Sequence, residues 1–230
     1  MTSSLRRPVR PLLAIALLAA GSVLAFGFTA ARGVTARASA TGTDVAHFEL
    51  VANPKFANCL AQYPGDPSRA PRADVTVRRG NLNDTLTLRI RDIRPNLAFD
   101  LFTVQRSSLL ADRSADPAFK DVGLAWYQSD VRADADGDGQ VSVRTILLDQ
   151  IFGFDPDVSL APTSTFHVGF WFNAPADAQA CGFDVTRATP FNGEHHAGPL
   201  AMISLPSAAT GLGPLCVKPD TSVTPARCNP

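Results

Sequence analysis

The chain has 230 residues, 45% of them hydrophobic and 18% charged, with 21 basic residues against 21 acidic ones. Residues 1–40 hold five of the arginines and no acidic residue, so the chain after them carries 16 basic against 21 acidic residues and is long enough for one domain with a substantial core. A mildly acidic chain without a basic run gives no electrostatic reason for binding to nucleic acid or to an anionic lipid surface.

The first 40 residues have the order of parts of a secretory signal peptide. Three arginines among the first ten residues precede an uncharged apolar run over residues 12–28. The A-x-A patterns that end at Ala38 and Ala40 offer the small side chains that a signal peptidase requires, so we expect cleavage near one of them. The run is close to the ~20 residues that span a bilayer, so an uncleaved anchor is the alternative. We predict a secreted or extracellular protein that touches a membrane only through residues 1–40.

All four cysteines follow this segment, which suits an oxidising compartment. An even number of cysteines in an exported chain predicts disulfides, and the CxxC or CxxxH spacing of a zinc site is absent. Spacing alone allows every pairing. We expect Cys59 to pair with Cys181, tying an early segment to a late loop, and Cys216 to pair with Cys228, closing a short loop in the proline-rich tail.

From residue 45 onward, apolar residues alternate with polar ones at a period of two, which is typical of strands with one buried face. The clearest case is residues 84–92, where leucine and isoleucine alternate with threonine and arginine. Residues 99–104 are apolar on both sides apart from Asp100, which predicts a central strand covered on both faces or a strand with a bulge. The same alternation recurs at residues 48–50, 75–77, 122–126, 141–143 and 166–172, and an apolar run follows at residues 200–205.

Turn-forming residues separate these segments and leave little room for helices. The chain contains 18 prolines and 16 glycines, and only residues 107–119 show a short helical pattern. Strands separated by turns predict an all-β fold, an antiparallel two-sheet β-sandwich of immunoglobulin-like or jelly-roll type with long loops. We expect residues 41–230 to form one such domain with a proline-rich C-terminal tail.

The most informative local motif is Asp-Ala-Asp-Gly-Asp-Gly-Gln-Val at residues 134–141. It resembles the DxDxDG calcium loop of EF-hands and dockerin-type modules, in which alternate carboxylates reach one cation and glycine permits a sharp turn. Thr145 stands at the twelfth position, where the resemblance would require a glutamate or an aspartate. The resemblance implies a weak structural calcium site, and the alternative is a plain β-hairpin with an acidic turn. The calcium ligands would be Asp134, Asp136, Asp138, Gln140 and Ser142.

The histidines suggest a different metal site. Histidines beside a carboxylate are the ligands of many copper and zinc sites. Adjacent residues on an extended chain point to opposite faces, so only one of His195 and His196 can join His167. The other interpretation of His167 is a histidine hydrogen-bonded to a neighbour. The ligands of this alternative copper or zinc site would be His47, His167, Glu194 and His196.

Two aromatic residues are left over once one face of each strand is assigned to the core. Tyr127 and Trp171 could form a binding patch for a protein or glycan partner. The chain contains no GxSxG, HExxH, SxxK or P-loop motif, so no catalytic residue is predicted. We expect a noncatalytic exported module with a structural or interaction role. A copper- or zinc-binding protein and a hydrolase of unfamiliar motif are the alternatives.

Overall fold

The structure of the chain is a computed structural model in which two units are distinguished, Met1–Ala38 and Ser39–Pro230. The predicted signal segment and its cleavage sites lie outside the residues that the structure describes. Among those that are described, no helix is both long enough and apolar enough to cross a bilayer. The described residues are 45–80, 83–146, 153–155, 160–163, 165–186, 197–216, 219–220 and 227–228.

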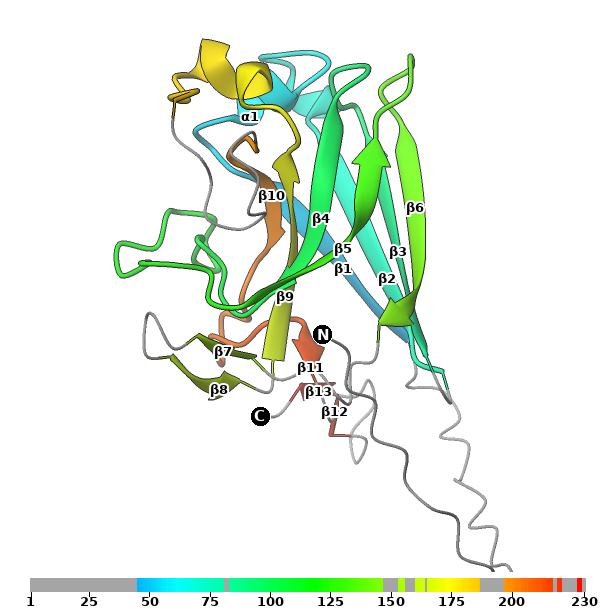
Figure 1. The fold of residues 1–230 in the computed structure, drawn as a ribbon, viewed down its shortest axis with the longest axis vertical. Coiled ribbons are helices and arrows are strands. Elements are labelled where there is room, and N and C mark those ends of the chain that lie inside the picture. Colours follow the sequence, from blue (N-terminus) through cyan, green and yellow to red (C-terminus); the bar gives the residue numbers. More distant parts are fainter. Residues whose placement is uncertain are drawn as a thin grey trace, which may run out of the picture. The chain divides into compact units, whose positions relative to one another are not determined.

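The second unit is built around one antiparallel sheet (Figure 1). Its order is β5 (Ala125–Arg132), β4 (Ala98–Val104), β9 (Thr165–Phe172), β10 (Leu200–Ser204), β1 (Val45–Ala52), β2 (Arg72–Arg78), β3 (Asp84–Arg91) and β6 (Gly139–Ile146). The short strand β11 (Leu215–Cys216) pairs with β9 off this path. Two small sheets are formed by β7 (Gly153–Asp155) with β8 (Leu160–Thr163), and by β12 (Pro219–Asp220) with β13 (Arg227–Cys228).

The prediction of a mostly β, antiparallel fold is confirmed, whereas the finer prediction of two stacked sheets is not. The described long strands form one continuous sheet, and β5 and β6, at the two ends of its path, are in contact. The sheet therefore curls into a nearly closed barrel (Figure 1). Alternation in the sequence shows only that each strand has a buried face, and a curled sheet buries that face as well as a sandwich does.

The inner face of the curled sheet holds the main core. On β3, Leu86, Leu88 and Ile90 are each 0% exposed, while Arg89 and Arg91 point to the solvent. Removing each large aliphatic side chain from water contributes ~1.5–3 kcal/mol, which makes the alternation a strong determinant of register. The same inner cluster is completed by side chains from other strands, among them Leu50, Val75, Val77, Phe99, Leu101, Val131, Phe166, Phe170 and Met202.

Strand β4 confirms the expectation of a central strand covered on both faces. It pairs with β5 on one side and with β9 on the other, and its pairing with β5 shifts register between Leu101 and Phe102. Leu101 lies in the inner cluster, and Phe102 lies in a second cluster on the outer face. Asp100, the polar exception, is 7% exposed and its Oδ1 accepts a hydrogen bond from Asn173 Nδ2 at 3.1 Å.

Short helices lie at one end of the sheet: α1 (Ala57–Leu60), η1 (Pro67–Arg69) and η3 (Pro175–Cys181) (Figure 1). Helix α1 contacts η3, and the predicted disulfide between Cys59 and Cys181 joins them, with a Cα–Cα distance of 6.0 Å. Leu60, at 0% exposed, enters the inner cluster from this end. The side chains of Cys216 and Cys228, the other predicted pair, lie outside the described residues.

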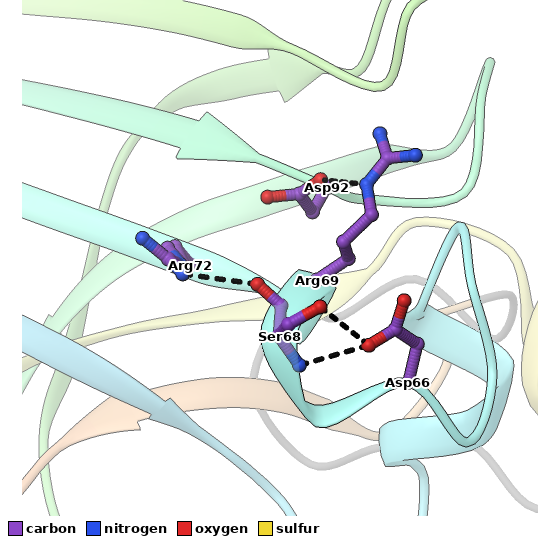
Figure 2. A network of polar contacts seen from close by, with 5 residues as sticks. All are labelled: Asp66, Ser68, Arg69, Arg72 and Asp92. Carbon is purple, nitrogen blue, oxygen red and sulfur yellow. Dashed lines mark hydrogen bonds and ion pairs between the residues drawn. The ribbon is translucent and has the colours of Figure 1, made fainter.

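A polar network holds the connection between α1 and β2 (Figure 2). Asp66 Oδ1 accepts hydrogen bonds from Ser68 N at 2.9 Å and from Ser68 Oγ at 2.6 Å, and these bonds lower the pKa of the Asp66 carboxyl. Arg72 donates to Ser68 O at 3.2 Å, and Arg69 Nε lies 3.4 Å from Asp92 Oδ1 at the end of β3. The network orients Arg72 at the start of β2.

The helical expectation for residues 107–119 is wrong. This segment contains turns and one isolated bridge, between Leu109 and Ala115, while the helical turns occur at 57–60, 67–69 and 175–181. Of its apolar residues, Leu109 and Phe119 pack in the second cluster on the outer face of the sheet, while Leu110 is exposed.

We expect the replacement of both Cys59 and Cys181 by alanine to lower the free energy of unfolding by about 2–5 kcal/mol, because the bond closes a loop of 122 residues in the unfolded chain. Urea unfolding of the double variant and of the wild type, each with and without a thiol reductant, measures this. The reductant should lower the free energy of unfolding of the wild type more than that of the variant, because the variant lacks this bond. A variant as stable as the oxidised wild type would contradict the expectation.

Candidate functional site

The outer face of β4, β9 and β10 is covered by residues 105–124, which we call the covering segment. Its two ends are held together by backbone bonds from Gln105 N to Leu124 O at 3.2 Å and from Arg106 N to Val122 O at 3.0 Å. Gln105 Oε1 also accepts a bond from Leu124 N at 2.6 Å. The covering segment thus leaves β4 and returns to β5 as a closed loop. The second cluster beneath it comprises Phe102, Val104, Leu109, Val122, Trp171, Leu200 and Ile203.

The two aromatic residues of the predicted binding patch lie in one row on this outer face. The Phe102 ring meets the Trp171 ring at a centroid distance of 5.3 Å and the Tyr127 ring at 5.6 Å, both edge to face. Tyr127 is 55% exposed and donates to Asp130 Oδ1 at 2.8 Å, whereas Trp171 is only 4% exposed. Trp171 therefore cannot act as a flat surface platform together with Tyr127. Phe102, which links them, is a residue that the sequence did not single out.

A cavity of about 250 Å³ lies between the covering segment and the sheet. Trp171 of β9 and Leu200 of β10 form its sheet side, and Phe119 and Val122 come from the covering segment. Its described lining is completed by Asn53, Ser108 and Asp121. The wall is thus largely aromatic and aliphatic with a few polar groups, which is the usual composition of a small-molecule site.

Asp121 is the only carboxylate among the described lining residues. Its Oδ1 accepts a long hydrogen bond from Gly123 N at 3.3 Å, and the side chain is half-buried. Gly123 has a φ of +72°, which favours glycine, and a Cβ there would lie 2.1 Å from Gln105 Oε1. The sequence did not predict Phe119 and Asp121 as site residues, because neither belongs to a recognisable motif.

Of the predicted copper or zinc ligands, the structure describes His47 and His167, while Glu194 and His196 lie outside the described residues. His47 is on the exposed outer face of β1, and its Nδ1 lies 3.0 Å from Thr76 Oγ1. His167 is 3% exposed, and its Nδ1 lies 3.0 Å from both Ser204 O and Ser204 Oγ. Within the described ranges, no group of three or more His, Cys, Asp or Glu side chains is arranged to hold a metal ion.

Burial lowers the pKa of His167 to about 4, although its hydrogen bond to Ser204 acts in the opposite direction. The neutral imidazole donates through Nδ1 to Ser204 O, because the carbonyl can only accept. The interpretation of His167 as a buried, hydrogen-bonded residue thus has a structural basis. The copper or zinc site stays a prediction.

We expect the protein to lose stability as the pH falls from about 6.5 to 4, with His167 contributing up to about 3 kcal/mol. The unfolded histidine takes up its proton near its ordinary pKa, whereas the folded one resists it, so this contribution is complete above that pKa and is lost toward pH 4. Urea unfolding at several pH values measures the slope. His167→Asn should flatten it, and His47→Asn, on an exposed side chain, should not; equal slopes in all three proteins would contradict the assignment.

The acidic motif at residues 134–138 joins β5 to β6. Asp134 Oδ1 accepts backbone bonds from Asp136 N at 2.9 Å and from Asp138 N at 3.0 Å, and Asp134 N donates to Asp138 O at 2.7 Å. Gly137 has a φ of +83°, and a Cβ there would lie 2.3 Å from Ile93 O, so this position requires glycine.

The flanking strands do not form the expected hairpin ladder. In the part of the chain that is described, β5 pairs with β4 and β6 pairs with β3, so the acidic loop connects the two ends of the sheet. Asp134, Asp136 and Asp138 lie in this loop, and Gln140 and Ser142 follow on β6, where they contact Arg89 and Thr87. The calcium site stays a prediction.

We expect Asp134→Ala to lower the free energy of unfolding by about 1–2 kcal/mol in the presence of EDTA, because two backbone amides lose their acceptor. Asp134→Asn, which keeps an acceptor oxygen, should lose less. Thermal melts of both variants with EDTA and with millimolar calcium test this. A melting shift that appears only with calcium, and that disappears in Asp136→Ala, would support the cation site instead.

Comparison of the chain with protein-family models, with curated proteins and with solved structures finds no match in any of the three. The function is therefore inferred from the chemistry of the described residues.

Proposed function

We propose that the protein is an exported, noncatalytic binding module that holds a small organic molecule in the cavity under the covering segment. The cavity, with Trp171 and Phe119 as aromatic walls, is the observation that supports it. Its described lining includes one hydroxyl, one amide and one carboxylate, but no histidine, cysteine or lysine. Such a lining suits recognition by shape and hydrogen bonding, and it offers no nucleophile paired with a base.

The size of the cavity limits the ligand. A dry cavity of about 150 Å³ accepts benzene, so about 250 Å³ suits a molecule of roughly ten non-hydrogen atoms, the size of a bicyclic ring. The Trp171 and Phe119 rings favour a flat aromatic or alicyclic body. Asp121 adds a negative charge, which favours a ligand with a protonated amine near the ring.

Export is the compartment that fits this module. The disulfide between Cys59 and Cys181 agrees with a location outside the cytoplasm, where disulfides persist. The arginine-led apolar segment at residues 12–28 supplies a route of export in this proposal. The rigid sheet would serve as the scaffold, and the covering segment as the variable part that forms the site.

Tryptamine and indole are suitable probes, because they share a ring and differ in the amine. We expect tryptamine to bind with a Kd of about 0.1–1 mM and indole several-fold more weakly, since only tryptamine places a cation beside Asp121. The chain has two tryptophans, so Trp126→Phe leaves Trp171 as the reporter. Because both probes carry an indole and fluoresce as tryptophan does, binding is measured by calorimetry, and Trp171 is followed by the NMR signal of its own indole N–H in isotopically labelled protein.

Two variants separate the contributions to binding. Asp121→Asn should remove the preference for tryptamine while leaving indole binding intact, and Phe119→Ala should weaken both ligands. Asp112→Asn, an exposed carboxylate elsewhere on the covering segment, is the matched control. If neither probe shifts the indole N–H signal of Trp171, or if Asp112→Asn acts like Asp121→Asn, the proposed site is wrong.

A further inference from the structure

The outer face of β1, β2, β3 and β6 differs from the covered half of the sheet, because its side chains reach the solvent. Five arginines project from it, and all are exposed. We call this surface the arginine face. Its arginines are Arg72, Arg78, Arg89, Arg91 and Arg144.

The arginine face is positive on a chain that is otherwise acidic. Among the described residues of this face, the acidic ones are Glu49 and Asp74, which leaves three positive charges in excess over those residues. Asp74 pairs with Arg91 at 2.7 Å. After residue 40 the chain has 16 basic and 21 acidic residues, so this one face gathers five of the 16 and only two of the 21. The charge is therefore segregated by the fold.

Hydroxyl groups lie between the arginines in a row across the strands. The pairing registers align His47 with Thr76, Thr76 with Thr87, and Thr87 with Ser142. His47 Nδ1 lies 3.0 Å from Thr76 Oγ1, and Thr87 Oγ1 lies 2.9 Å from Ser142 Oγ. These contacts order the side chains of the row, so the face presents an ordered set of hydrogen-bonding groups.

The arginines lie on both sides of this row, toward the two ends of the strands. Arg72 stands directly opposite Arg91, and Arg89 on the same strand donates to Gln140 Oε1 at 2.7 Å. Arg78 lies six residues further along β2 from Arg72, which corresponds to ~20 Å at the rise of a strand. Two like charges directly opposite destabilise a strand pair. Asp74 offsets part of this repulsion through its ion pair with Arg91, and an anion bound beside Arg72 would offset more of it.

The Arg72 side chain is held in place rather than free to fold away. It donates to Ser68 O, and Asp66 fixes Ser68 through two hydrogen bonds (Figure 2). Arg91 is similarly held by Asp74. Guanidinium groups that are ordered before binding lose less side-chain entropy when they meet an anion.

We propose that the arginine face binds an anionic polysaccharide, whose carboxylates meet the arginines on both sides of the row while its hydroxyls meet the threonine and serine side chains of the row itself. Arginine is suited to carboxylate groups because its planar fork donates two parallel hydrogen bonds. The ~20 Å separation of Arg72 and Arg78 requires a chain of several sugar units. The site is distinct from the cavity under the covering segment, on other strands of the sheet.

The composition of the face favours a polysaccharide over two other polyanions. An anionic membrane surface is bound most firmly by proteins that also insert apolar side chains, and the only large exposed hydrophobic residue on the described part of this face is Val45. Single-stranded nucleic acid is bound by stacking on aromatic rings, and the outward positions of these four strands carry none.

The test uses polygalacturonate as the anionic polymer and dextran as the neutral one. The wild type should be retarded in affinity electrophoresis by polygalacturonate and not by dextran, and its affinity should fall about tenfold or more between 50 and 200 mM salt, as expected for several charge contacts. Arg78→Gln combined with Arg89→Gln should weaken binding at least tenfold and reduce the salt dependence.

The matched control is Arg113→Gln combined with Lys120→Gln, which removes the same charge from exposed positions on the covering segment. This control should bind polygalacturonate as the wild type does, and thermal melts should show that both double variants are folded. Equal weakening in the two double variants would overturn the proposal, as would failure of the wild type to bind. Stronger binding to anionic vesicles or to single-stranded DNA than to polygalacturonate would also overturn it.

Discussion

The burial of both faces of β9 is the constraint on which the rest of the structure depends. All eight residues of Thr165–Phe172 are buried, with the phenylalanines turned to the inner cluster and Trp171 to the outer one. A strand of this kind needs cover on both faces of the sheet, because its side chains on both sides must be removed from water. The curl of the sheet covers the inner side, and the covering segment covers the outer side. The cavity lies where that second cover meets the sheet.

The remaining architecture follows from closing the ends of this arrangement. Helix α1 and η3 come from distant parts of the chain and meet over one end of the inner core, where the disulfide joins them. The acidic loop joins β5 to β6 and so brings the first and last strands of the path into contact. Its glycine and its internal hydrogen bonds allow a tight connection at that point.

The two halves of the outer face thereby acquire different chemistry. Over β4, β9 and β10 it is apolar and covered, and it carries the proposed small-molecule site. Over β1, β2, β3 and β6 it is polar and exposed, and it carries the arginine face. The same alternation of residues produces both. The outward positions of the first group include Phe102, Trp171 and Ile203, whereas those of the second are mainly charged or polar.

Much of the fold could be predicted from the sequence. Alternation at a period of two showed the strands, the apolar run at residues 99–104 showed a strand buried on both faces, and the pairing of Cys59 with Cys181 was expected. These are local patterns, or follow from a small number of possible pairings.

The surfaces proposed to carry function could not be predicted in this way, because their residues are not neighbours in the sequence. Arg72, Arg89 and Arg144 are far apart in the chain and form no basic run, so only the antiparallel registers brought them to one face. Likewise, Phe119 and Trp171 line one cavity because the covering segment folds back over the sheet.

The sequence by itself determined which side of each strand is buried, since that depends on neighbouring residues and water. The tertiary structure alone decided which strands lie side by side and what covers them, since that depends on contacts between residues distant in the chain.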